Sequence, residues 1–229
     1  MLTFAHRGGL DGGFPPNSLA AFADALERGC QIETDLRLSA DRQVVCTHDG
    51  FFLVGIRPAW VARMSAARLG RLGVPTLDQL YRELGSDFEL SADLKVAAVA
   101  APAIAVARAA GAVRRLWLVS ADLRTLAAIR TDDTDVRLMH EARHGDLAAE
   151  NLHPSDHLDR LAAQRIDAAN TTAGDWTPDL VARARAVGVR AFGSLLQTRR
   201  AMDRAVTLGL DGFYSDHLDL MRAAVEATS

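Results

Sequence analysis

The stretch "CQIETDLRLSADRQVVCTHDG" (30–50) contains two apolar segments, 31–36 and 43–48, with the composition of β-strands. In the first segment Glu33 and Asp35 occupy alternate positions, so on a strand both side chains point to the same side. Two adjacent carboxylates repel each other, and burying them is costly unless a cation lies close by. The stretch therefore predicts a strand that presents two acids to a positive group, followed by a second strand that leads to His48.

Short apolar strands alternate with amphipathic helices along the rest of the chain. We expect helices at 17–29, 100–111, 177–188 and 198–209, with Asn17 and Thr177 as N-caps. We expect strands at 2–6, 31–36, 43–48, 88–94, 115–120, 135–140, 166–171, 189–195 and 212–216. This alternation favours a parallel sheet with crossover helices. With 43–48 taken as a hairpin partner of the second strand, eight strands remain. The sequence thus predicts the α/β class, as a single-domain (β/α)8 TIM barrel over residues 1–229.

The composition excludes several classes of protein. A net charge of −3 over 229 residues, with a pI near 6.2, gives no sign of a nucleic-acid-binding surface. Cys30 and Cys46 are too few for a disulfide framework or a zinc ribbon. No apolar run approaches the roughly 18 residues that span a membrane. No cationic segment followed by a long apolar one opens the chain, so we expect a soluble, cytoplasmic protein.

Charged side chains gather where the expected strands end, which is where TIM barrels carry their active sites. Lys95 is the single lysine among 26 basic residues, and a lysine offers a compact point charge that arginine does not. Carboxylates favour a hard cation such as Mg²⁺ or Ca²⁺, while histidines exchange protons near neutral pH. Cleavage of a phosphate ester is the natural class of reaction for such a set. The candidate residues are His6, Arg7, Glu33, Asp35, His48, Asp93 and Lys95.

The segment "HRGGLDGGFPPNSLAAFADALERGCQIETDLRLSADRQVVCTHD" (6–49) resembles the signature of glycerophosphodiester phosphodiesterases. The resemblance continues through "VPTLDQLYRELG" (74–85), "ADLK" (92–95) and "GLDGFYSDHLDLM" (209–221), and so covers nearly the whole chain. It implies hydrolysis of glycerophosphodiesters, which are small-molecule substrates, to glycerol 3-phosphate and an alcohol. The cofactor that it implies is one divalent metal ion, Mg²⁺ or Ca²⁺.

The resemblance also assigns a role to each candidate residue. His6 and His48 correspond to the acid–base pair, and Arg7 and Lys95 to the groups that hold the phosphate. Glu33, Asp35 and Asp93 correspond to the metal ligands.

Several positions depart from the family pattern. Pro16 stands where the family has a glutamate, and Asp93 replaces a glutamate that is one carbon–carbon bond longer. Segment 191–197 lacks the family's usual tryptophan and asparagine, and segment 120–123 lacks the phenylalanine that the family has after its serine. These departures leave two alternatives open: a phospholipase D-like enzyme that acts on lysophospholipids or sphingolipids, and a barrel that binds phosphate without cutting it.

The segment "HEARH" (140–144) matches the zinc-peptidase pattern H-E-x-x-H, which requires both histidines on one face of a helix. Because a strand is expected to lead into it and Gly145 follows at once, we expect no zinc site there. His140 and Glu141 are instead expected at the barrel mouth. The remaining histidines, His153, His157 and His217, are expected at the surface. The short span between His48 and Asp93 predicts an open site without a covering lid.

Overall fold

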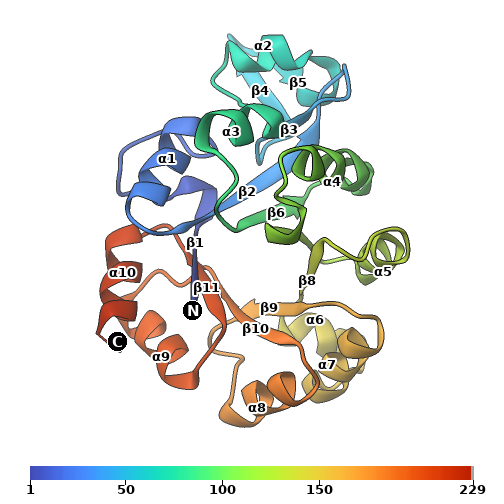
Figure 1. Ribbon diagram of the computed structural model, residues 1–229, viewed down its shortest axis with the longest axis vertical. Coiled ribbons are helices and arrows are strands. Elements are labelled where there is room, and N and C mark those ends of the chain that lie inside the picture. The colour runs from blue at the N-terminus through green and yellow to red at the C-terminus, as the bar shows by residue number, and fades with distance from the viewer. Residues whose placement is uncertain (228–229) are drawn as a thin grey trace.

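The computed structural model describes residues 1–227, and their backbone closes into a barrel ringed by helices (Figure 1). Eight parallel strands pair in the order β1-β11-β10-β9-β8-β7-β6-β2, and a pairing of β1 with β2 closes the ring. These strands are β1 (Leu2–Ala5), β2 (Gln31–Leu38), β6 (Leu90–Leu94), β7 (Leu116–Ser120), β8 (Arg137–Glu141), β9 (Ala168–Thr172), β10 (Arg190–Ser194) and β11 (Gly212–Ser215). The expected (β/α)8 barrel is confirmed.

Helices form the outer layer. The longer ones are α1 (Leu19–Glu27), α3 (Leu77–Leu84), α4 (Ala100–Ala109), α5 (Leu123–Asp132), α7 (Pro154–Ala163), α8 (Pro178–Ala186), α9 (Arg199–Leu208) and α10 (Leu218–Glu226). Shorter turns are η1 (His6–Gly8), η2 (Val61–Arg63), α2 (Ala66–Gly70), η3 (Ala97–Val99), η4 (Val113–Arg115) and α6 (His144–Ala149). Within the described chain, every helix is too short or too polar to cross a membrane.

The alternation of side chains along each strand divides the core into two parts. Outward-facing residues such as Ile32, Leu36 and Leu90 are fully buried beneath the helices. The inward-facing set is aromatic near the start of the strands, where the Phe4 and Tyr214 rings stack with their centroids 5.0 Å apart. Because these rings fill the barrel interior, the polar inward residues further along the strands are left at its C-terminal mouth.

The register of β2 places its two acids at that mouth. Glu33 pairs with Ser91 and Asp35 with Asp93 on the neighbouring parallel strand β6, so these four residues share the inner face. The alternate residue Thr34 points the other way and is buried. The unusual alternation of acids and apolar residues in the sequence is therefore the inner and outer face of one barrel strand.

Two local features differ from the sequence prediction. Helix α1 is capped by Ser18, whose hydroxyl accepts from the Ala21 amide, and Asn17 instead has a left-handed backbone with φ of 58°. The prediction that Asn17 is the cap was wrong, because Ser18 is an equally good cap one residue nearer the helix. The Thr177 cap of α8 is confirmed.

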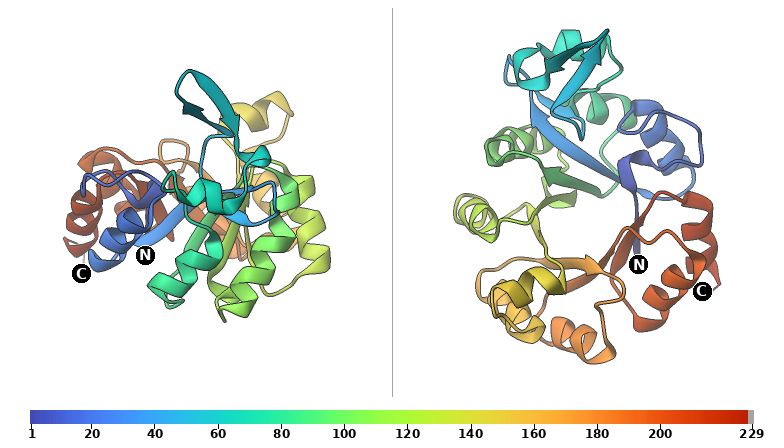
Figure 2. Two further views of the ribbon diagram at one scale, coloured as in Figure 1. Left: turned by 90° about the horizontal axis from the view of Figure 1, so that it is seen from above. Right: turned by 180° about the vertical axis from the view of Figure 1, so that it is seen from behind.

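A small insertion, absent from the prediction, follows the hairpin partner β3 (Val44–Cys46). β3 pairs antiparallel with β2 as expected. The chain then forms a separate hairpin of β4 (Phe51–Val54) and β5 (Arg57–Trp60), which rises above one end of the barrel (Figure 2). Val61, Met64 and Leu69 form a small core that holds the insertion against Val45.

Candidate active site

A cavity of about 330 Å³ lies at the C-terminal mouth of the barrel. It contains all seven residues that the sequence singled out, although they come from 90 residues of chain. Among the described residues, none of the β4–β5 hairpin lines this cavity, although the hairpin lies in the span between His48 and Asp93. The uncovered site stays a prediction. Its full lining is His6, Arg7, Glu33, Asp35, His48, Ser91, Asp93, Lys95, Val119, Glu141, Arg143, Asn170, Ser194, Leu195 and Tyr214.

Asp35 is the centre of an ionic network. Its Oδ1 lies 2.9 Å from Lys95 Nζ, and its Oδ2 lies 3.3 Å from Arg7 Nε. The same lysine also binds Asp93, the residue beside Asp35 in the sheet. Burial acts to raise the pKa of Asp35, but Lys95 and the Asn17 amide outweigh it, so this pKa is lowered overall. Asp35 is therefore ionised at neutral pH.

Asn17 takes part in this network rather than in a helix cap. Its Nδ2 donates to Asp35 Oδ2 at 3.0 Å, and its Oδ1 accepts from the Thr34 hydroxyl at 2.7 Å. All three side chains are buried. Asn17 thus fixes the orientation of the Asp35 carboxylate, a role that the sequence analysis missed.

Glu33 lies in a more enclosed position. It accepts a hydrogen bond of 2.7 Å from the backbone amide of Arg7, and it is 6% exposed. Burial, followed by the negative charge of Asp35, raises the pKa of Glu33 to about 8. The position is one where an added positive charge is strongly favoured.

His6 is oriented by a residue from the far end of the chain. Its Nδ1 lies 2.7 Å from Asp216 Oδ1, and the Gln197 amide donates to the other oxygen of that carboxylate. Burial acts to lower the pKa of His6, but the bond to Asp216 and the charge of Glu33 raise it overall. With Nδ1–H directed at Asp216, Nε2 is the nitrogen left for proton transfer. Asp216 and Gln197 were missed, although the family-like segment 209–221 includes Asp216.

His48 stands at the rim of the cavity. Its side chain is 42% exposed, and its Nδ1 lies 2.9 Å from Asp49 Oδ1. The guanidinium of Arg37 donates two hydrogen bonds, of 2.9 and 2.8 Å, to the His48 carbonyl oxygen. Both histidines are therefore paired with a carboxylate, one inside the barrel and one at its edge.

The opposite wall of the cavity adds polar groups that the sequence did not single out for chemistry. Glu141 ends β8 and faces the cavity as expected, and burial raises its pKa. Asn170 is 5% exposed, and its Oδ1 has no hydrogen-bond partner. Arg143 supplies a further cation to the lining.

The H-E-x-x-H segment does not form a zinc helix. His140 lies on strand β8, and His144 begins helix α6, so the two rings do not share a helical face. His140 lines a neighbouring cavity rather than the main one. The prediction that His157 is a surface residue was wrong: it is 5% exposed, and its Nε2 lies 3.2 Å from His140 Nδ1.

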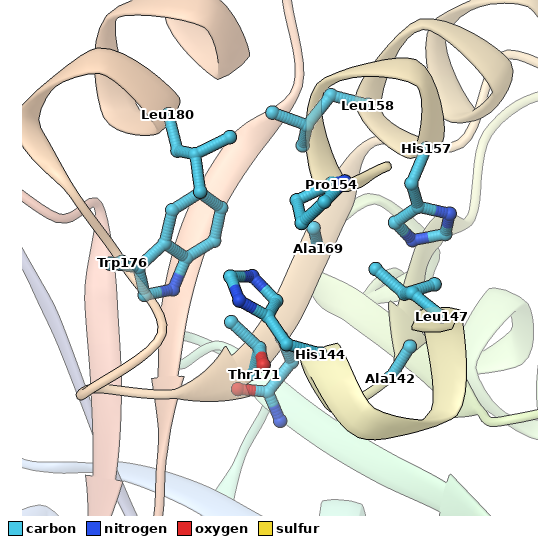
Figure 3. A pocket seen from close by; sticks show the side chains of 11 residues that line it. Ala142, His144, Leu147, Pro154, His157, Leu158, Ala169, Thr171, Trp176 and Leu180 are labelled. Atoms are coloured by element: carbon cyan, nitrogen blue, oxygen red, sulfur yellow. The ribbon is translucent and has the colours of Figure 1, made fainter. Parts of the chain in front are cut away.

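A further, largely apolar cavity of only about 20 Å³ adjoins the main one, and Asn170 lines both. Figure 3 shows Trp176 and Leu180 on one side of it and Leu158, Pro154 and His157 on the other. It contains no acid and no arginine, so the phosphate chemistry expected from the sequence belongs to the larger cavity.

The barrel and its mouth define an enzyme whose acids, cations and histidines suit reactions at phosphate. The family model described as the glycerophosphoryl diester phosphodiesterase family matches residues 6–220. The chain belongs to this family, and the expectation of a phosphodiesterase is confirmed.

Solved structures show the same fold. A glycerophosphodiester phosphodiesterase from Thermotoga maritima is 18% identical with a TM-score of 0.81, covering 96% of both chains. One from Agrobacterium tumefaciens is 22% identical with a TM-score of 0.78, covering 97% of this chain and 99% of that chain. A phosphodiesterase from Oleispira antarctica, in complex with the product sn-glycerol-3-phosphate, is 19% identical with a TM-score of 0.77, covering 99% and 97%. No curated protein sequence matches the chain.

Proposed function

We propose that this protein hydrolyses glycerophosphodiesters to glycerol 3-phosphate and an alcohol. The observation that carries the proposal is the meeting, in one cavity, of two carboxylate-paired histidines with three acids and two cations. The family match and the product bound to the Oleispira phosphodiesterase support the choice of substrate. The substrate is thus a small-molecule diester.

In this reaction one histidine acts as a general base and the other as a general acid. The 2-hydroxyl of the glycerol attacks phosphorus as one imidazole takes its proton. The bond from phosphorus to the leaving alcohol breaks as the other imidazole supplies a proton to that oxygen. A water molecule then opens the cyclic phosphate to give glycerol 3-phosphate. Asp216 keeps His6 Nε2 directed at the cavity, while Arg7, Lys95 and Arg143 offset the charge of the phosphate.

We propose that a hard divalent cation binds beside these acids, because carboxylate oxygens are the ligands that such ions prefer. Glu33 and Asp35 share the inner face of β2, and Asp93 lies beside Asp35 on β6. Burial, and next the negative charge of Asp35, raises the pKa of Glu33 to about 8, so a cation bound beside this carboxyl would be favoured. Among the residues that the structure describes, no three acids, histidines or cysteines converge on one point, and Lys95 instead bonds both Asp35 and Asp93. We propose that Glu33, Asp35 and Asp93 would hold Mg²⁺ or Ca²⁺ once the lysine moves aside, and the ion would polarise the phosphate.

The direct test is release of glycerol 3-phosphate from glycerophosphocholine by metal-stripped protein refilled with Mg²⁺, Ca²⁺, Mn²⁺ or Zn²⁺. We expect turnover that requires a hard cation and falls by at least about 10²-fold in His6→Ala. Glu33→Gln should lose both metal binding, measured by calorimetry, and activity. His153→Ala, which removes an exposed histidine outside the cavity, is the matched control.

Two outcomes would contradict the proposal. Release of choline from lysophosphatidylcholine, with glycerophosphocholine left intact, would assign the phospholipase D-like alternative. Binding of metal and phosphate by folded protein, without turnover of either substrate, would assign a barrel that binds without cutting.

A further inference from the structure

Exposed apolar side chains are concentrated at the end of the barrel that carries the mouth. With the side chain of Val54 left aside, eleven large apolar side chains are exposed in the described chain. Nine of them lie in the loops and in the insertion that follow the C-terminal end of a strand, whereas Met1 begins the sequence and Leu220 lies on helix α10. The nine are Leu10, Phe14, Phe51, Leu53, Ile56, Trp60, Leu72, Val96 and Leu195.

The β4–β5 hairpin carries the most exposed members of this set. Ile56 at its tip is 95% exposed and Leu53 is 69% exposed. Phe51 and Trp60 face each other across the two strands with ring centroids 5.5 Å apart, and both remain about half exposed. One face of the hairpin packs on the small core around Val61, while this second apolar face has no partner in the described chain.

The hairpin stands beside the catalytic mouth. Phe51 begins only three residues after His48, and the Val61 amide returns to bond the Gly50 carbonyl oxygen at 2.9 Å. Seen from the side, the hairpin projects from the same end of the barrel as α6, which follows β8 and its cavity-lining Glu141 (Figure 2, left). A flat surface that contacts the hairpin tip would therefore face the mouth.

The charge of this insertion is opposite to that of the whole chain. Residues 50–77 contain four arginines and no acid, lysine or histidine, although the chain has a net charge of −3. The four are Arg57, Arg63, Arg68 and Arg71, and all are exposed. None of them forms an ion pair within the described residues, whereas the exposed Arg114 and Arg183 do. The insertion thus combines a bare apolar face with unpaired positive charge.

We propose that the insertion docks on an anionic lipid surface, with the active-site mouth turned toward it. Exposed aromatic and aliphatic side chains flanked by arginines are the composition of protein segments that bind at the interface of a bilayer. The apolar face enters the interface, and the arginines bind lipid phosphates. A second copy of this chain is the less suitable partner, because an isologous contact would bring unpaired arginines against arginines.

This inference goes beyond the proposed reaction and does not depend on it, because the test measures binding alone. The purified protein is sedimented with vesicles of phosphatidylcholine, with or without phosphatidylglycerol, at low and high salt. We expect binding that requires phosphatidylglycerol and weakens with salt. Arg57→Glu should weaken it by more than roughly fivefold, the contribution of one basic residue near such a surface.

Matched controls separate the surface from general effects of mutation. Leu53→Asp should abolish binding, whereas Leu220→Asp, which alters an exposed leucine on α10, should not. Arg114→Glu, at an arginine whose side chain is 83% exposed and which precedes β7 at the opposite end of the barrel, should bind like wild type. Hydrolysis of dissolved glycerophosphocholine should be unchanged in Leu53→Asp.

The proposal is overturned if wild-type protein does not bind anionic vesicles, or if each variant and its control lose binding equally. It is also overturned if the protein dimerises without lipid and Leu53→Asp prevents this, since the face would then belong to a second copy.

Discussion

The buried pair His140 and His157 makes a specific prediction about acid stability. The carbonyl oxygen of Ala121 can only accept a hydrogen bond, so His140 Nε2, 3.1 Å away, carries a proton. A neutral His140 then accepts at Nδ1 from His157 Nε2. This leaves His157 Nδ1 as a buried nitrogen without a partner, and protonating it would place an unpaired charge beside a second imidazole.

The size of the effect follows from the two states of His157. Burial, and next the neighbouring His140, lower the pKa of His157 from 6.5 to about 4 in the folded protein. Below pH 6.5 His157 binds a proton in the unfolded chain but stays neutral in the folded protein, so stability falls as the pH decreases toward 4. The loss between pH 7 and pH 5 is about 2 kcal/mol in the free energy of unfolding.

Urea unfolding at a series of pH values, followed by circular dichroism, measures this loss. In His157→Gln the amide can still donate to His140, but position 157 no longer titrates. We expect the variant's free energy of unfolding to decline less than that of wild type, by about 2 kcal/mol between pH 7 and pH 5. His153→Gln is the matched loss of one histidine on the same segment. Parallel pH profiles for wild type and His157→Gln would refute the reasoning.

Three further predictions concern the mouth of the barrel. Asp216→Asn should lower the pKa of His6, which an NMR titration of the imidazole would measure, and should reduce kcat by on the order of 10²-fold. An unchanged titration would show that Asp216 does not orient the ring. Lys95→Met should lower the free energy of unfolding of metal-free protein by about 3 kcal/mol, because Asp35 and Asp93 lose their cation. Mg²⁺ should then raise the Tm of the variant more than that of wild type. Equal Tm shifts would argue against the metal ion binding where the Lys95 ammonium lies. Gly8→Ala should lower the free energy of unfolding by about 1–3 kcal/mol, because the new Cβ would lie 2.6 Å from Ala21 Cβ and the residue has a φ of 89°. A stability equal to wild type in urea unfolding would contradict this.

The sequence could determine whatever depends on neighbours along the chain. Strand and helix periods are local, and all nine expected strands are present within two or three residues of their expected bounds. The two-residue period places Glu33 and Asp35 on one face without any knowledge of the fold. The position of charged residues at strand ends predicted that six of these side chains meet, because parallel strands end at the same mouth, while His48 was assigned to the site by the resemblance to the family.

Residues that are far apart in sequence gain their partners only when the barrel closes. The pairing of β1 with both β2 and β11 brings Asp216 to His6 across 210 positions, and no local pattern indicates that bond. The same closure places Lys95 between two acids and buries His157 against His140.

Asn17 and the β4–β5 hairpin show the same limit at shorter range. Asn17 looks like a helix cap by composition, and only the buried contact with Asp35 and Thr34 shows what its amide does. The hairpin of residues 51–60 packs one face on a small core, while Phe51, Leu53, Ile56 and Trp60 stay exposed, which its apolar composition alone does not indicate. Local periodicity and composition thus determined the elements and the inner face that holds the acids. The tertiary structure decided which charges are paired, because burial and hydrogen bonding depend on contacts that form only in the closed barrel.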